Sequence, residues 1–148
     1  MKTPRIESKD PRKKRDSLEI MINTTMDSDK LIYDCIGASM QVYNHLGPGL
    51  LETIYEKVLK YELIQRGYDV ETQVKVDIKY KDVVLDTDLR LDLIVEETLI
   101  IELKSVEDLA PVHFKQLRTY MKLLDKPVGL LINFNVKSLK EGIKRYVM

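Results

Sequence analysis

The sequence predicts an α/β domain in which helices flank a mixed sheet. The central observation is a pair of apolar runs, 89–95 and 99–105, whose length, β-branched content and short polar break are those of a β-hairpin. Helical patterns precede this hairpin, and a helix, an apolar run and a last helical pattern follow it. That order is typical of helices packed on a mixed sheet. The 148 residues are enough for one such domain.

Residues 1–26 differ from the rest of the chain in charge and pattern. They carry seven Lys or Arg against four Asp or Glu, an excess of +3, so residues 27–148 carry −3 because the whole chain is neutral. The segment lacks apolar periodicity, which predicts a disordered basic N-terminal tail before a domain at 27–148. We interpret the tail as an arm that touches phosphates, as a solvated extension, or as residues upstream of the true start.

The first half of the domain predicts two helices and a pair of strands. Apolar residues at helical spacing predict helices over 29–45 and 50–66, separated by an LGPG segment that stops the first. Strict alternation over 69–80 predicts a strand with one solvated face. A turn at 81–82 then leads into a return strand that begins at 83–85.

The register of the central hairpin decides which of its charged residues meet. A three-residue loop from Glu96 to Thr98 places Asp92 opposite Glu102, and it likewise places Arg90 opposite Lys104 on the same face. A two-residue loop would move Asp92 to the other face, because a slip of one residue inverts a strand. We predict the three-residue loop.

Two carboxylates on one face of a hairpin admit two interpretations. In the first, Asp92 and Glu102 hold a cation between them, because paired carboxylates repel and hard oxygen ligands suit Mg²⁺ or Mn²⁺. Lys104 beside them can then orient a water or neutralise charge on a phosphate. In the second, Asp92, Glu102, Arg90 and Lys104 form a cross-strand ladder of salt bridges on a solvated face. The residues alone leave both open.

The last third of the chain predicts a helix, a buried strand and a final helix. Residues 111–124 have helical periodicity, and Gln116 and Tyr120 lie together on one flank of that helix because they are four residues apart. This pair is interpreted either as ordinary exposed polar residues or as substrate contacts. The continuous apolar run at 127–134 predicts a strand buried on both faces, and 136–146 reads as a closing helix.

Several short motifs of the sequence together resemble those of one known family. An Asp followed about ten residues later by Glu-x-Lys on the next strand resembles the core of the PD-(D/E)xK nuclease superfamily. The words GPGLLETIYE, IELKSVE, PVHFKQL and GLLINF, in this order, resemble the GxxExxY family of short prokaryotic proteins within it. The resemblance covers the chain from about Leu31 to Tyr146.

The resemblance implies a restriction-endonuclease-like core and a role for each candidate residue. Asp92, Glu102, the backbone carbonyl of Leu103 and Glu52 would hold Mg²⁺ or Mn²⁺, with Glu52 approaching from a helix opposite the hairpin. Lys104 would position the attacking water. Gln116 and Tyr120 match the Gln-x-x-x-Tyr motif of the RecB-like branch and would orient the scissile phosphate, and Arg90 is a candidate phosphate contact. For Glu52, favourable interaction with the helix dipole is a sufficient alternative explanation.

These features predict a metal-dependent nuclease acting on DNA or, as the less favoured substrate, RNA. The alternative is a nuclease-like fold retained as a nucleic-acid-binding or protein-interaction module without catalysis, which the lack of net basic charge favours. No run is long enough to span a membrane and no signal peptide is recognisable, so we expect a cytoplasmic protein that does not bind membranes. The single cysteine, Cys35, excludes a disulfide within the chain and a cysteine zinc site. A homodimer or a protein partner is compatible with either function.

Overall fold

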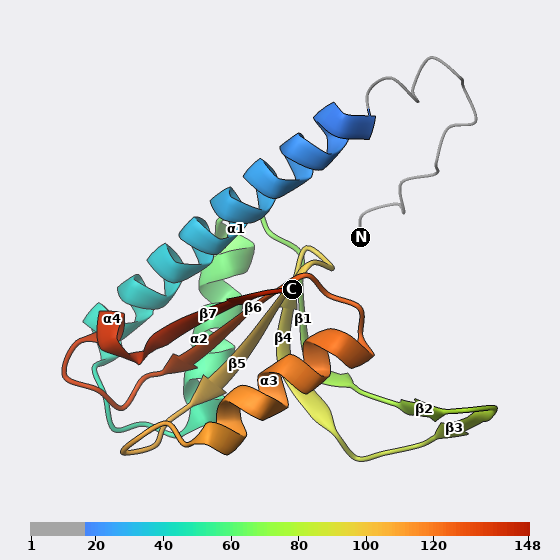
Figure 1. The fold of residues 1–148 in the computed structure, drawn as a ribbon. Helices are drawn as coiled ribbons and strands as arrows, with labels where there is room; N and C mark the ends of the chain where they lie inside the picture. The colour runs from blue at the N-terminus through green and yellow to red at the C-terminus, as the bar shows by residue number, and fades with distance from the viewer. Residues whose placement is uncertain (1–16) are drawn as a thin grey trace.

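The computed structural model describes the backbone of residues 17–148 and the side chains from Ser28 onward. Within residues 17–148, seven strands and four helices form an α/β unit (Figure 1). In chain order they are α1 (Ser17–Leu46), α2 (Glu52–Gln65), β1 (Val70–Lys75), β2 (Ile78–Tyr80), β3 (Val83–Leu85), β4 (Arg90–Val95), β5 (Leu99–Lys104), α3 (Pro111–Leu123), β6 (Val128–Asn133), α4 (Leu139–Gly142) and β7 (Ile143–Val147).

Five of the strands form one mixed sheet, in the order β1-β4-β5-β6-β7. Only β5 and β6 run parallel, because α3 crosses over between them, and the other neighbours are antiparallel. All six residues of β6 are buried, as predicted from its continuous apolar sequence. The structure therefore confirms the predicted α/β class and the mixed central sheet.

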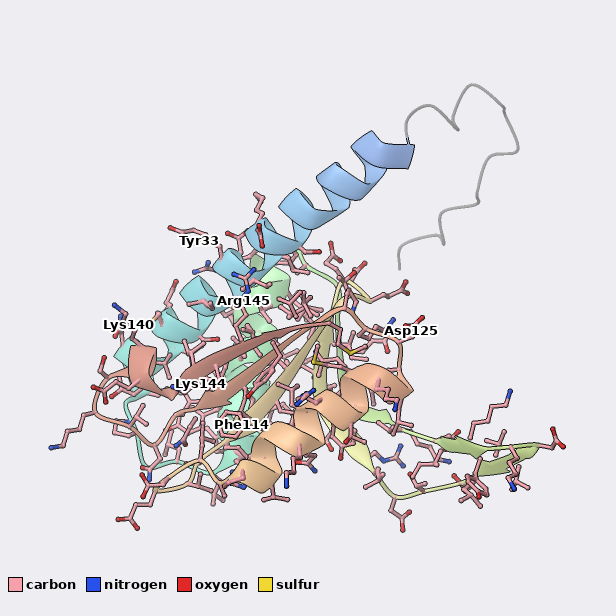
Figure 2. All side chains as sticks on the ribbon, in the orientation of Figure 1. Tyr33, Phe114, Asp125, Lys140, Lys144 and Arg145 are labelled. Atoms are coloured by element: carbon pink, nitrogen blue, oxygen red, sulfur yellow. The ribbon has the colours of Figure 1, made fainter. Side chains whose placement is uncertain are left out.

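Helices cover both faces of this sheet (Figure 1). The larger apolar core lies between the sheet and α1 and α2, and it includes Tyr55 stacked on Phe134 with ring centroids 4.3 Å apart. The smaller core lies under α3, where Leu117, Tyr120 and Met121 are buried. The ring of Phe114 of α3 also packs edge-to-face on the ring of Tyr146 of β7. Figure 2 labels Phe114 on the side of α3 that faces the sheet.

The first helix begins earlier than the sequence predicts. Its backbone is helical from Ser17, so the part of the predicted disordered tail at 17–26 is helical instead. Extending an existing helix adds one hydrogen bond per residue without a new nucleation cost, so a weakly patterned segment can continue the helix that follows it. The part of that prediction covering residues 1–16 lies outside the described residues. None of the helices within 17–148 is long and apolar enough to cross a membrane.

Two predicted elements at the ends of the sheet differ from the structure. The closing helix predicted over 136–146 is wrong, because only the four residues of α4 are helical and β7 follows. Strand β7 pairs antiparallel with β6, which satisfies backbone groups that β6 would otherwise expose. The single strand predicted over 69–80 is divided into β1 and β2.

Strands β2 and β3 form a separate two-stranded sheet that projects away from the main body (Figure 1). All three residues of β3 are exposed. At the base of this arm, Val76 is buried under α3 and its backbone N–H donates to the carbonyl of Leu89 at 3.0 Å. The chain therefore leaves the main sheet after Val76 and returns to it at β4.

Along both β1 and β4, the apolar side chains change from one face of the sheet to the other at one level. We call this change the exchange of faces. Residues two or four apart in a regular strand share a face, yet Leu93 packs in the core under α1 and α2 whereas Leu91 packs under α3. Val70 and Val74 of β1 divide in the same way. Thr72 pairs with Leu93 and Val74 with Leu91, so the exchange occurs at the level of Gln73 and Asp92.

Candidate functional site

The central hairpin has the predicted three-residue loop. Val95 pairs with Leu99, which leaves Glu96, Glu97 and Thr98 in the turn. Both glutamates have positive φ, of 54° and 55°. The turn therefore gives the register in which residue 92 lies across from residue 102.

Beyond Leu93 and Ile101, the backbone ladder between β4 and β5 stops and side chains replace it. The N–H of Asp92 donates to Glu102 Oε1 at 3.0 Å, and the N–H of Leu103 donates to Asp92 Oδ2 at 2.8 Å. Meanwhile β4 still pairs with β1, and β5 still pairs with β6. The two strands thus open apart, and the carboxylates of Asp92 and Glu102 lie in the opening.

Burial makes these two carboxyl groups unusual acids. Loss of solvation, together with the negative charge of Asp92, raises the pKa of Glu102 to about 8. Loss of solvation likewise raises the pKa of Asp92 to about 6, against the stabilising hydrogen bond from Leu103. The positive charge of Lys104 lowers both pKa values, but it does not offset the burial. The positive charge of Lys104 therefore compensates only part of the cost of burying the pair.

A chain of polar groups connects Lys104 to α3. Its Nζ donates to Gln116 Oε1 at 3.4 Å, and Gln116 Nε2 donates to the Tyr120 hydroxyl at 3.1 Å. Tyr120 is only 3% exposed, so the interpretation of this pair as ordinary exposed polar residues is wrong for Tyr120. Burial raises the pKa of Tyr120, and the charges of Glu102 and Asp92 act in the same direction. Gln116 and Tyr120 therefore border the carboxylate pair.

Glu52 approaches the same region from α2. It occupies the first turn of that helix, and its Oε1 accepts a hydrogen bond from the N–H of Ser105, just after β5, at 3.3 Å. Its negative charge raises the pKa values of both Asp92 and Glu102, so it lies within electrostatic reach of them. Glu52 is thus held at the edge of the carboxylate pair by the backbone of Ser105.

The loop before α2 is held by Tyr55, and this contact positions Glu52. The buried hydroxyl of Tyr55 donates to the carbonyl of Gly47 at 2.6 Å and accepts from the N–H of Leu50 at 3.1 Å. Gly47 and Gly49 have φ values of 69° and 102°, which glycine adopts without strain. The GPG segment is therefore shaped to return the chain over this hydroxyl and into α2.

Replacing Tyr55 by phenylalanine removes both hydrogen bonds while keeping the ring stacked on Phe134. We expect the free energy of unfolding to fall by about 1 to 2 kcal/mol, since two loop bonds are lost. Chemical denaturation measures this change. Tyr61→Phe is the control, because Tyr61 is 65% exposed on the same helix. An unchanged stability in Tyr55→Phe would contradict the proposed anchoring of the loop.

The donor set at this site fits a hard divalent cation. The N–H of Leu103 points toward β4, so its carbonyl points to the same side, because the two groups of one strand residue share a direction. Two carboxylates and a carbonyl oxygen are ligands of the type that Mg²⁺ and Mn²⁺ prefer. Within residues 28–148, however, no three His, Cys, Asp or Glu side chains form a ready metal cluster. Glu52 would have to turn away from Ser105 to complete one.

Arg90 does not lie where the register predicts. It pairs with Lys75 of β1 and is exposed, whereas the ladder between β4 and β5 ends before it reaches Lys104. The exchange of faces at Asp92 separates Arg90 from Glu102. Among the described side chains, no ion pair joins Arg90 or Lys104 to Asp92 or Glu102, so the alternative interpretation as a ladder of salt bridges is wrong.

Two residues near Asp92 were missed by sequence reasoning. Gln73 of β1 directs its Nε2 to Glu56 Oε1 at 2.5 Å and to Asp92 Oδ1 at 3.4 Å. The charge of Glu56 also raises the pKa of Asp92. Glu56 was detectable, because it is four residues after Glu52 and shares its helix face. Gln73 carries no such signal, because alternation only marked it as an exposed strand residue.

Comparison with known protein families identifies the family of the chain. A model of the PD-(D/E)XK nuclease superfamily matches residues 29–146. A search of curated proteins and a search of solved structures each gave no match. The matched segment extends from the middle of α1 to the end of the sheet at β7, and it contains all the candidate residues described above.

Proposed function

Because the chain belongs to the PD-(D/E)XK nuclease superfamily, we propose that it is a metal-dependent nuclease that hydrolyses phosphodiester bonds of DNA, with RNA as the less favoured substrate. Nucleases of this superfamily generally depend on a divalent metal ion. We assign the chain to the GxxExxY group on the words GPGLLETIYE and IELKSVE. The Gln116–Tyr120 pair supports the RecB-like branch.

The observation that carries the proposal is the carboxylate pair, in which Glu102 is buried and Asp92 is partly buried, with Lys104 beside it. Burying acidic groups costs free energy unless positive charge accompanies them. Glu102 is 4% exposed, and the pKa values of both carboxyls are raised despite the Lys104 charge. A divalent cation would offset this cost, which is the physical reason for such a pair to be retained.

Each residue then has a role that follows from its place. Asp92, Glu102 and the Leu103 carbonyl would hold Mg²⁺ or Mn²⁺, and Glu52 would complete the set after leaving Ser105. A bound ion supplies Lewis acidity, lowers the pKa of water and offsets charge on the phosphate. Lys104 orients the attacking water at its Nζ. Gln116 holds the Lys104 side chain from α3 and is itself bonded to Tyr120, and both residues would contact the scissile phosphate.

The hydrolysis places water against phosphorus on the side opposite the leaving oxygen. The water loses one proton to solvent as its oxygen forms a new bond to phosphorus, the bond from phosphorus to the leaving oxygen breaks, and the leaving oxygen takes up one proton from solvent, so that one water is consumed for each bond cleaved. Negative charge grows on the phosphate oxygens as this occurs. The Lys104 ammonium is positioned to stabilise it, because the polar chain to Gln116 fixes its direction. Arg90 is exposed at the base of the β2–β3 arm, so we propose it only as a contact to phosphates beyond the cleaved bond.

The experiment is a cleavage assay on purified protein with single- and double-stranded DNA and RNA. Each substrate is incubated with Mg²⁺, with Mn²⁺ and with chelator. We expect cleavage of DNA that requires either ion, and we expect the double variant Asp92→Asn/Glu102→Gln to abolish it. Cleavage that persists in this variant would indicate a contaminant. Absence of cleavage under every condition would instead favour a nuclease fold that binds nucleic acid or protein without catalysis.

A further inference from the structure

Gln73 is an unusual residue for the middle of a strand. Its φ is 51°, in the left-handed region that residues other than Gly, Asn and Asp rarely adopt. The residues on both sides of it keep their pairing with β4, so no residue has been inserted into the strand. Such backbone conformations cost free energy and persist only where the surroundings impose them.

The left-handed conformation occurs where β1 and β4 exchange faces. Gln73 lies opposite Asp92 in the register, since Thr72 and Val74 pair with Leu93 and Leu91. The exchange interrupts the pairing of β1 with β4 at Gln73 and Asp92 alone, and at this level the Asp92 N–H donates to the side chain of Glu102. The backbone of Gln73 is therefore part of what opens the hairpin at the carboxylate pair.

The side chain of Gln73 acts on the same residue. Its Nε2 lies between two carboxylates, bonded to Glu56 of α2 and to Asp92 Oδ1. The second oxygen of Asp92 is held by the Leu103 N–H. Asp92 is thus held from two sides, by β5 through its Oδ2 and by Gln73 through its Oδ1. An amide suits this place, because it donates two hydrogen bonds and adds no charge.

We propose that Gln73 is a positioning residue that presents the Asp92 carboxylate to the divalent cation, an inference that rests on the proposed metal-dependent function. Glu56 fixes the amide of Gln73 from α2. The amide in turn fixes the direction of Asp92 Oδ1. Partners of this kind typically change metal affinity by about 10- to 100-fold when they are replaced.

The test separates the amide from the backbone conformation. Gln73→Gly and Gln73→Asn both accept positive φ, so both keep the exchange of faces. Glycine removes the amide, and asparagine is one methylene too short to reach both carboxylates. Asp125→Gly is the matched control, because Asp125 has a φ of 52° and lies at the end of α3 (Figure 2). Dissociation constants for Mn²⁺ are measured by calorimetry where circular dichroism shows every variant folded.

We expect both Gln73 variants to bind Mn²⁺ about 10- to 100-fold more weakly than the wild type, and Asp125→Gly to bind as the wild type does. Wild-type affinity in Gln73→Gly or Gln73→Asn overturns the positioning role and leaves the nuclease proposal standing. Weakening by the same factor in Asp125→Gly also overturns the role, because the effect is then general. A wild-type protein that binds no Mn²⁺ overturns both proposals together.

Discussion

Replacing Lys104 by alanine is expected to lower the rate of metal-dependent DNA cleavage by about 10² to 10³-fold, the usual effect of removing one preorganised electrostatic group. The positive charge of the Lys104 ammonium acts on both carboxyl groups and lowers the pKa of Asp92 and of Glu102. It is also held by Gln116 at 3.4 Å, so it meets the growing charge without reorganising. Single-turnover kinetics at saturating Mn²⁺ measures the loss.

The same variant should keep its fold and its affinity for Mn²⁺. The cation is proposed to be held by Asp92, Glu102 and the Leu103 carbonyl, none of which is altered. Lys140→Ala is the control, because Lys140 is an exposed lysine on α4 that is not among the candidate site residues (Figure 2). If Lys104→Ala cleaves at the wild-type rate, Lys104 has no part in the chemistry. If it loses Mn²⁺ binding instead, its role is in the metal site.

Metal-free protein is expected to lose stability as the pH rises from about 5 to about 8. The pKa of Glu102 is raised from 4.5 to about 8 by burial, so across this window the folded state holds a proton that the unfolded state has released. Stability falls with pH wherever the folded state binds more protons. The expected loss is on the order of a few kcal/mol, and the raised pKa of Asp92 adds to it in the lower part of the window.

Urea denaturation at several pH values in chelator measures this slope. Glu102→Gln should remove most of it, because glutamine does not titrate, whereas Glu141→Gln, at an exposed position on α4, should leave it unchanged. Saturating Mn²⁺ should also flatten the slope, since the bound ion favours the ionised carboxylates. A wild-type stability that rises between pH 5 and pH 8 without metal would show that the pKa of Glu102 is not raised.

Local patterns determined most of the fold of this protein. The length and apolar content of the hairpin runs, and the odd-numbered loop, were sufficient to predict β4, β5 and their register. The continuous apolar run of β6 predicted a buried strand. These features depend on residues that are close in the chain, where periodicity and turn chemistry act directly. The quoted words also predicted the superfamily that the family model matches.

Long-range contacts decided what the sequence could not. The segment of β7 has few local signals that separate helix from strand, and the unpaired edge of β6 decides in favour of a strand. Arg90 was misplaced because the register assumed a regular strand, while β1 and β4 exchange faces at Gln73 and Asp92. That exchange involves the left-handed conformation of Gln73 on β1 and the residue opposite it on β4, Asp92.

The candidate site likewise has some features that the sequence predicts and others that depend on the tertiary structure. The sequence by itself determined that Asp92, Glu102 and Lys104 lie on adjacent strands, because their spacing and the loop are local. Only the tertiary structure decided that Glu102 is buried, that Asp92 is partly buried, and that each carboxylate accepts a backbone N–H. It also decided that Gln73 and Glu56 hold Asp92 from β1 and α2. The physical reason is that burial and hydrogen bonding between distant segments depend on packing, which no local pattern encodes.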